Sequence, residues 1–270
     1  MYQTVNLYNE PREILISTQE KYCEMTADEQ GFLCGLIKEK EPKKILEVGV
    51  AGGGTTSVIM KCLDIVNPDA HMYSCDLNEE CYRKKGKRTG YQLEEVKECL
   101  SNYSNHKFCL GGVLPQFIDE IGPGIDFCIL DTAHSMPGEI LDFLCALPYL
   151  KDGAIVVLHD VANNLLGKYP RAYATKVLLD SVYAEKYYNY DSGINNIAAF
   201  MVRKETREYI ANVFSALSIT WTYEPSIAEI MLYRDSYKNH YDSECIKLFD
   251  VFWELNHKKI SELMSLNSKQ

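Results

Sequence analysis

Residues 45–56 read ILEVGVAGGGTT, and this stretch decides the fold. Its apolar start predicts a strand that closes with the acidic Glu47, and a turn dense in glycine follows. Glycine adopts backbone conformations closed to other residues and lets a ligand approach the main chain. The residues after the turn predict a helix, whose first N–H groups suit a carboxylate or a phosphate. We therefore expect a strand, a binding turn and a helix in succession.

Further short apolar runs follow this unit and predict the other strands of a sheet. They cover residues 71–76, 107–110, 125–130, 154–158 and 197–202. Helical patterns lie between them; in one, Ile59, Cys62, Leu63 and Val66 share a face before Asn67-Pro68. Strands that are apolar throughout are typical of parallel sheets covered on both faces. The alternation predicts an α/β fold with a doubly wound parallel sheet.

The two ends of the chain differ from this core. Residues 26–29 have the Thr-x-x-Glu spacing of a capping box and precede apolar residues at helical spacing. The stretch after Lys204 is rich in helix formers and aromatic residues. We expect a helical extension over residues 1–42, a binding domain over 43–203 and a helical tail over 204–270. We expect the helical segments at the two ends to pack on their own domain or to form a homodimer surface.

Composition narrows the functional classes. The chain has 270 residues, 46% of them hydrophobic, and a formal net charge of −10. This composition excludes disordered and fibrous proteins. The acidic balance makes nucleic acid an unfavourable partner, since nucleic-acid binding depends on neutralising phosphates. One basic cluster, RKKGKR at residues 83–88, is either a solvated loop or a group placed to meet an anionic substrate.

The start of the chain and its cysteines indicate in which cellular compartment we expect the protein. Residues 1–20 contain no apolar stretch of the secretory type, and no apolar run approaches the roughly 18 residues needed to cross a bilayer. None of the ten cysteines forms a Cys-x-x-Cys pair, which removes the main pattern of zinc ribbons and thioredoxins. We expect a reduced, cytoplasmic protein without membrane contact.

An acid at the end of the second predicted strand points to a nucleoside. Asp76 ends that strand, where a carboxylate can accept both ribose hydroxyls of an adenosine. The structural alternative is a tight turn with Asp76 as a helix cap.

A dinucleotide fold would show Gly-x-Gly-x-x-Gly, whereas this chain reads Glu-x-Gly-x-Ala-Gly-Gly-Gly. That pattern resembles the first motif of class I S-adenosylmethionine-dependent methyltransferases. Within them it is most similar to the small-molecule and sugar O-methyltransferases typified by macrocin O-methyltransferase.

The resemblance covers about residues 43–203 and implies a Rossmann-like sheet with an antiparallel last strand. It also implies a binding site for S-adenosylmethionine. Asp76 would hold the ribose, Leu77 would pack near the adenine, and the loop with Gly112 and Val113 would lie beside the adenine. The methionine part would be held by Glu47, Gly49, Ala51, Gly52, Gly53 and Thr55, with Asp131 as a further contact.

Two acids follow later strands and would meet across the cleft. Asp131 and Asp160 both lie beyond the carboxyl ends of predicted strands, where ligands bind in this kind of sheet. Related metal-dependent O-methyltransferases use acids here to hold Mg²⁺, but His159 stands where relatives often carry a second acid. Histidine suits Mn²⁺, Fe²⁺ or Zn²⁺ better than Mg²⁺. The candidate metal ligands are therefore Asp131, His159 and Asp160. The alternative is that Asp131 contacts cofactor or substrate while Asp160 caps a helix.

The candidate catalytic residues are His134 and Asp131. Relatives carry an acid two residues after the strand-ending Asp, but Ala133 cannot take a proton. His134 is the nearest titratable side chain, and an ordinary imidazole can accept a hydroxyl proton near neutral pH. A structural role for His134 is the alternative.

The sequence thus favours an S-adenosylmethionine-dependent methyltransferase acting on a hydroxyl of a small molecule or sugar, with or without a divalent metal. A NAD-dependent Rossmann oxidoreductase is the first alternative, although its glycine spacing and a Tyr-x-x-x-Lys pair are missing. The others are a catalytically inactive nucleoside-binding relative and, more weakly, a nucleic-acid methyltransferase.

Overall fold

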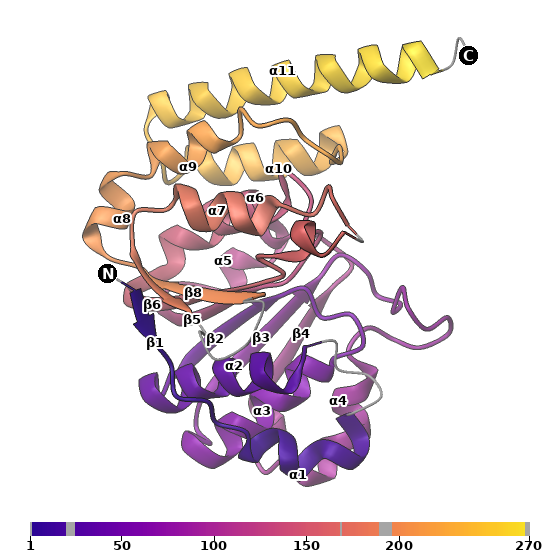
Figure 1. The fold of residues 1–270 in the computed structure, drawn as a ribbon, viewed down its shortest axis with the longest axis vertical. Coiled ribbons are helices and arrows are strands. Elements are labelled where there is room, and N and C mark those ends of the chain that lie inside the picture. The colour runs from indigo at the N-terminus through magenta and orange to yellow at the C-terminus, as the bar shows by residue number, and fades with distance from the viewer. Residues whose placement is uncertain (1, 20–24, 168, 189–195, 268–270) are drawn as a thin grey trace.

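The structure is a computed structural model that describes residues 2–19, 25–167, 169–188 and 196–267. Its centre is an eight-stranded sheet with the order β1-β7-β8-β6-β5-β2-β3-β4 (Figure 1). The strands are β1 Tyr2–Thr4, β2 Lys44–Val48, β3 His71–Asp76, β4 His106–Leu110, β5 Ile125–Leu130, β6 Leu150–His159, β7 Glu185–Tyr188 and β8 Ile197–Met201. Only β8 runs antiparallel to its neighbours, β6 and β7. The predicted doubly wound sheet with an antiparallel last strand is confirmed.

Helices cover both faces of the sheet (Figure 1). One layer contains α1 Glu10–Gln19, α2 Ala27–Lys40, α3 Gly54–Val66 and α4 Tyr91–Val96. The other contains α5 Ile118–Ile121, α6 Gly138–Ala146 and α7 Ala174–Ser181, followed by α8 Lys204–Glu208, α9 Ala211–Ala216, α10 Ile227–Lys238 and α11 Ser243–Asn267. Short 3₁₀ turns connect them: η1 Lys97–Cys99, η2 Tyr103–Asn105, η3 Leu114–Gln116, η4 Leu147–Tyr149 and η5 Asn163–Leu166.

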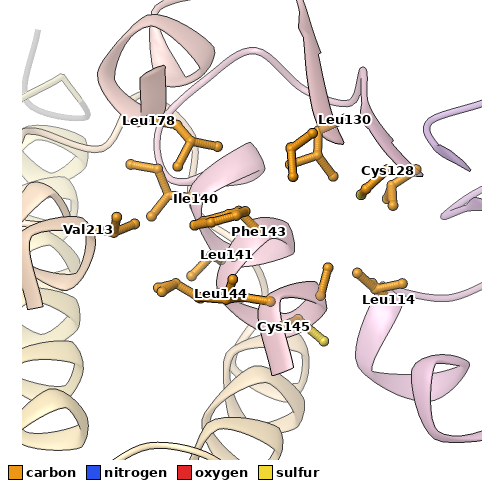
Figure 2. Packing of buried hydrophobic residues seen from close by; sticks show 14 of the residues in the cluster. Leu114, Cys128, Leu130, Ile140, Leu141, Phe143, Leu144, Cys145, Leu178 and Val213 are labelled. Atoms are coloured by element: carbon orange, nitrogen blue, oxygen red, sulfur yellow. The ribbon is translucent and has the colours of Figure 1, made fainter. Parts of the chain in front are cut away.

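Alternation along the strands divides the core into two clusters. Leu46 and Val48 of β2 pack in the cluster with α6, whereas Ile45 packs in the cluster with α2 and α3. Because both faces are covered, nearly every central-strand residue is buried. The C-terminal helices add a further layer over α6, which is therefore buried on all sides. Figure 2 shows Phe143 of α6 between Leu130 of β5 and Val213 of α9.

Two strands were not expected from the sequence. β7 has two charged residues followed by two tyrosines, and only Tyr187 of its four side chains is buried. β1 joins the sheet edge beside β7, so the extension over residues 1–42 is not purely helical. Both strands are short and lie at the edge, where one-sided burial weakens the apolar pattern. The C-terminal tail is helical, as predicted.

The nine cysteines within the described ranges are all free thiols, and all but Cys99 are buried. Among the described residues, no helix combines the length and apolar character needed to cross a membrane.

Candidate active site

The candidate active site lies where the strand order reverses. From β2 the chain continues to β3 and β4 on one side, and it later returns to β5 and β6 on the other. Ligands bind beyond the carboxyl ends of strands at such a switch point. Gly49 approaches the end of β5 so closely that a Cβ there would lie 1.9 Å from the carbonyl oxygen of Asp131. Only glycine lets the two segments meet in this way.

The turn after β2 has the geometry of a binding loop. Gly49, Ala51 and Gly53 have φ values of 95°, 49° and 87°. Gly53 is the N-cap of α3 and supplies no side-chain hydrogen bond. Gly49, Ala51, Gly52 and Thr55 are half-buried rather than covered, so the turn keeps an accessible surface.

Asp76 joins the turn to the end of β3. Its Oδ2 accepts hydrogen bonds from the backbone N–H groups of Val50 (2.9 Å) and Ala51 (3.1 Å). Its Oδ1 accepts one from the N–H of Asn78 at 2.8 Å. Oδ1 also accepts a long hydrogen bond from Asn78 Nδ2 at 3.4 Å, and since a carboxylate offers about four acceptor positions, a ribose hydroxyl would take the place of this long contact. Leu77 next to it is 55% exposed and offers an apolar surface to a base.

The loop after β4 lies against this edge of the site. The N–H of Gly111 donates to the carbonyl of Asp76 at 3.0 Å, which brings the loop beside the candidate ribose site. Gly112 is buried against Gln116, and Val113 is half-buried at the start of η3. The structure therefore groups all the predicted nucleoside contacts at the ends of β3 and β4.

Glu47 lies behind the turn rather than on its surface. Its side chain is 1% exposed, and its Oε2 accepts a hydrogen bond from Thr56 Oγ1 at 2.8 Å. Its Oε1 has no partner among the described residues. Burial raises the pKa of Glu47 to about 8, so the carboxyl is largely protonated at neutral pH. Any influence on a ligand would pass through Thr56 and the start of α3.

A cluster of histidines and acids occupies the ends of β5 and β6. His159 Nδ1 lies 3.2 Å from Asp131 Oδ1 and 3.7 Å from Asp160 Oδ1. On its other side, His159 Nε2 lies 3.6 Å from Oε2 of Glu29 in α2. Burial opposes a charge on His159, but these carboxylates outweigh burial and raise its pKa well above the usual value.

His134 is placed between the same two aspartates and a third acid. Its Nε2 lies 3.1 Å from Asp160 Oδ2 and 3.5 Å from Asp131 Oδ1. Its Nδ1 lies 3.2 Å from Oε1 of the fully buried Glu139. Burial would lower the pKa of His134, but Glu139 and then the two aspartates raise it to about 9. Contrary to the expectation from an ordinary imidazole, His134 is largely protonated at neutral pH.

The neighbouring histidines lower the pKa of Asp131. Burial would raise the pKa of Asp131, but the charge and hydrogen bond of His159 and the charge of His134 hold it below its usual value. Asp160 is further held by Asn196 Nδ2 at 2.6 Å and Asn163 Nδ2 at 3.1 Å. The Asp131 carboxylate is thus kept ionised, and hydrogen bonds fix the orientation of Asp160.

The site also contains four residues that no sequence pattern marked as functional: Glu29, Glu139, Asn163 and Asn196. Glu29 was identified only as part of a capping box, which the structure contains. Glu139 accepts hydrogen bonds from the backbone N–H groups of His134 (2.7 Å) and Thr132 (3.2 Å), so it shapes the loop as well. In the sequence, only its place five residues after His134 marks Glu139.

Backbone strain also concentrates here. Four non-glycine residues within the described ranges have positive φ, and three of them, Ala51, His134 and Asp160, belong to this site. Such conformations cost on the order of 1 kcal/mol each and are commonly retained for function.

The donor set fits a divalent cation and contains two of the three predicted ligands, Asp131 and Asp160. Asp131, His134 and Asp160 each offer one ligand atom, and these atoms lie within 4.8 Å of one another. His159, the predicted third ligand, instead bridges Asp131 and Glu29. The acids outnumber the histidines by four to two, so the cluster retains negative charge that a cation would neutralise.

The fold is of the Rossmann-like kind found in methyltransferases. Residues 46–161 match a family model described as a methyltransferase domain, and no curated protein matches the sequence. Solved structures give the same result for the fold. The O-methyltransferase TomG from Streptomyces achromogenes, involved in tomaymycin synthesis and in complex with SAM, has a TM-score of 0.52 and 16% identity. The alignment covers 73% of this chain and 91% of that chain.

The O-methyltransferase from Bacillus cereus, in complex with SAH, has a TM-score of 0.51 and 16% identity, over 71% of this chain and 90% of that chain. At these identities the likeness establishes the Rossmann-like methyltransferase fold. With the family match, it supports a class I S-adenosylmethionine-dependent methyltransferase.

Proposed function

We propose that this chain transfers a methyl group from S-adenosylmethionine to a hydroxyl of a small molecule or sugar, as in the macrocin-type branch. The observation that carries the proposal is the arrangement of residues around the switch point of the sheet. A glycine turn and Asp76 lie on one side of the switch point, and the Asp131–His134–Asp160 cluster lies on the other. A nucleoside site and an acid–base site next to each other are what a methyl transfer to oxygen needs.

The residues fit the cofactor by their chemistry. Asp76 is an acceptor for a ribose diol, the exposed Leu77 is an apolar surface for adenine, and the open turn offers main-chain contacts to the methionine part. S-adenosylmethionine supplies a methyl carbon that is already electrophilic. The protein therefore contributes mainly alignment of the acceptor oxygen and exclusion of water.

The cluster of Asp131, His134 and Asp160 would remove the proton from the acceptor hydroxyl. Asp131 and Asp160 would orient the hydroxyl, and His134 would accept its proton once its own proton has left. A divalent ion held by Asp131, His134 and Asp160 would supply a Lewis acid that lowers the pKa of the hydroxyl. With such an ion bound, His134 would be a ligand and not the base, so its role as proton acceptor belongs to the metal-free form.

Ligand binding tests the cofactor assignment. At one hundred times its dissociation constant, S-adenosylhomocysteine should stabilise the protein by about 2.7 kcal/mol. For a chain of this size that corresponds to a rise in Tm of about 5–10 °C. NAD⁺ should give no rise. Asp76→Asn should abolish most of the effect, and the exposed Asp69→Asn is the matched control. A rise with NAD⁺ alone would reject the proposal.

Turnover and metal dependence test the chemistry. Labelled methyl groups should pass from S-adenosylmethionine to a metabolite extract, and no transfer to any acceptor would favour an inactive nucleoside-binding relative. EDTA should lower the rate, and Mn²⁺ should restore it better than Mg²⁺ because one ligand is a histidine. If EDTA leaves the rate of methyl transfer unchanged, a metal has no role in the reaction and His134 is the sole base.

A further inference from the structure

Glu139 is a buried acid that contacts both the ring and the main chain of His134. It lies in the first turn of α6, every residue of which is buried, and its own exposed fraction is 0%. Its Oε1 accepts hydrogen bonds from the backbone N–H groups of His134 (2.7 Å) and Thr132 (3.2 Å). The same oxygen lies 3.2 Å from His134 Nδ1. A carboxyl group is costly to bury unless it is well paired, so this acid depends on its contacts with the loop.

The two nitrogens of the His134 ring face different surroundings. Nδ1 is buried beside Glu139, and among the described residues it has an ion-pair contact there but no aligned hydrogen bond. Nε2 lies 3.1 Å from Asp160 Oδ2 and 3.5 Å from Asp131 Oδ1. The His134 side chain is 19% exposed, so the ring can be reached from outside. Nε2 is therefore the nitrogen placed to share a ligand with the two aspartates.

The loop conformation that gives His134 this place needs support. His134 has a φ of 53°, in the left-handed region that non-glycine residues rarely adopt. Two hydrogen bonds that hold the loop end on Glu139, and the N–H of Ala174 donates a third to the carbonyl of His134 at 2.9 Å. A strained backbone persists only where its surroundings hold it. Loss of the Glu139 carboxyl would therefore release the ring and the main chain of His134 together.

His159 differs from His134 in accessibility. Its side chain is 6% exposed, with Nδ1 3.2 Å from Asp131 Oδ1 and Nε2 3.6 Å from Glu29 Oε2. The group of ligand atoms within 4.8 Å of one another contains His134 and not His159. The acid behind His134 is therefore the one that bears on a bound ion.

We propose that Glu139 is a positioning residue, which turns His134 so that Nε2 binds a divalent cation together with Asp131 and Asp160. This rests on the proposed function. A histidine that binds a metal usually presents its other ring nitrogen to a carboxylate, a carbonyl or water, which fixes the orientation of the ring. Glu139 lies in that place. Because an imidazole ligand favours Mn²⁺ over Mg²⁺, Glu139 would also set the metal preference of the site.

Metal affinity measures the effect of Glu139. Free Mn²⁺ is followed by electron paramagnetic resonance while the ion is titrated into the protein with S-adenosylhomocysteine present, and Mg²⁺ is measured by competition. Glu139→Ala should weaken Mn²⁺ binding about tenfold or more. The preference for Mn²⁺ over Mg²⁺ should fall as well, because the imidazole is no longer held. Glu139→Gln keeps an acceptor oxygen and should stay within about threefold of the wild type.

Asp142→Asn is the matched control. Asp142 is another buried acid of α6, and it accepts a hydrogen bond from Thr132 Oγ1 at 3.3 Å in the same loop. This variant should change Mn²⁺ affinity by less than about threefold, since the contacts of the His134 ring remain. In a His134→Ala background, Glu139→Ala should cause no further loss, because the two residues act through one ring.

A spectrum of the wild type makes the test independent of whether Glu139→Ala folds. In the Zn²⁺-loaded protein, a long-range proton–nitrogen correlation spectrum should show the His134 ring with Nε2 bound to the metal and Nδ1 protonated. His134→Gln assigns the signals, since it removes those of this ring.

Four results would overturn the assignment of Glu139. They are an equal loss of Mn²⁺ affinity in Glu139→Ala and Asp142→Asn, additive losses from Glu139→Ala and His134→Ala, metal bound at Nδ1, and no binding of a divalent ion to the wild type. In each case normal S-adenosylhomocysteine binding leaves the proposed function standing. Absence of S-adenosylhomocysteine binding to the wild type would instead defeat the proposed function, so the two failures are distinguishable.

Discussion

Glu47→Gln should remove a pH dependence of stability that the buried carboxyl imposes. The pKa of Glu47 is about 8 in the folded protein, against 4.5 for the free side chain. Between these values the folded state holds a proton that the unfolded state releases, so this residue makes the protein less stable as pH rises. The slope is about 1.4 kcal/mol per pH unit. From pH 5.5 to pH 7.5, the stability of Glu47→Gln relative to wild type should therefore rise by about 2–3 kcal/mol.

Urea unfolding followed by the fluorescence of Trp221 and Trp253 measures this difference. Asp142, whose pKa is raised by burial to about 7, contributes a slope of the same sign, but it is present in both proteins and cancels. The exposed Glu98→Gln is the matched control and should run parallel to wild type. A constant difference between Glu47→Gln and wild type across this range would refute the argument. Unchanged S-adenosylhomocysteine affinity in Glu47→Gln is expected as well, because the side chain lies behind the turn.

Three further outcomes follow from the contacts. Asp131→Asn and Asp160→Asn should each reduce bound Mn²⁺ in metal analysis and lower kcat by tenfold or more, with little change in S-adenosylhomocysteine affinity for Asp160→Asn. Phe143→Ala should destabilise the protein by about 3–5 kcal/mol in urea unfolding, because the ring is fully buried between the sheet and the C-terminal helices. Tyr233→Phe removes a 2.6 Å hydrogen bond to the buried Asp142, which also accepts from Thr132 in the site loop. It should cost about 1–3 kcal/mol and lower kcat, whereas a purely local contact would change stability alone.

The central architecture was predictable because its signals are local. Apolar strands, helix stops and the glycine turn each depend on a few neighbouring residues, and β2, β3 and β5 begin and end within one residue of the predicted runs. The edge strands β1 and β7 were missed, since half-exposed strands carry little apolar pattern. The predicted metal set included His159, but the geometry groups His134 with the two aspartates. Which of two histidines faces a cation depends on loop conformation, and the positive φ of His134 is not visible in residue order.

The sequence by itself determined the order of the central strands and of the helices between them, the position of the glycine turn and the acids at the strand ends. These follow from backbone propensity and from burial period, which act over a few residues. Only the tertiary structure decided the ionisation and the partners of the site. Glu29 and Glu139 come from opposite faces of the sheet to the two histidines, Glu29 to His159 and Glu139 to His134. Glu139 and the two aspartates reverse the charge state expected for His134 at neutral pH. Electrostatic energy depends on distance and burial in space, and residue spacing along the chain carries neither.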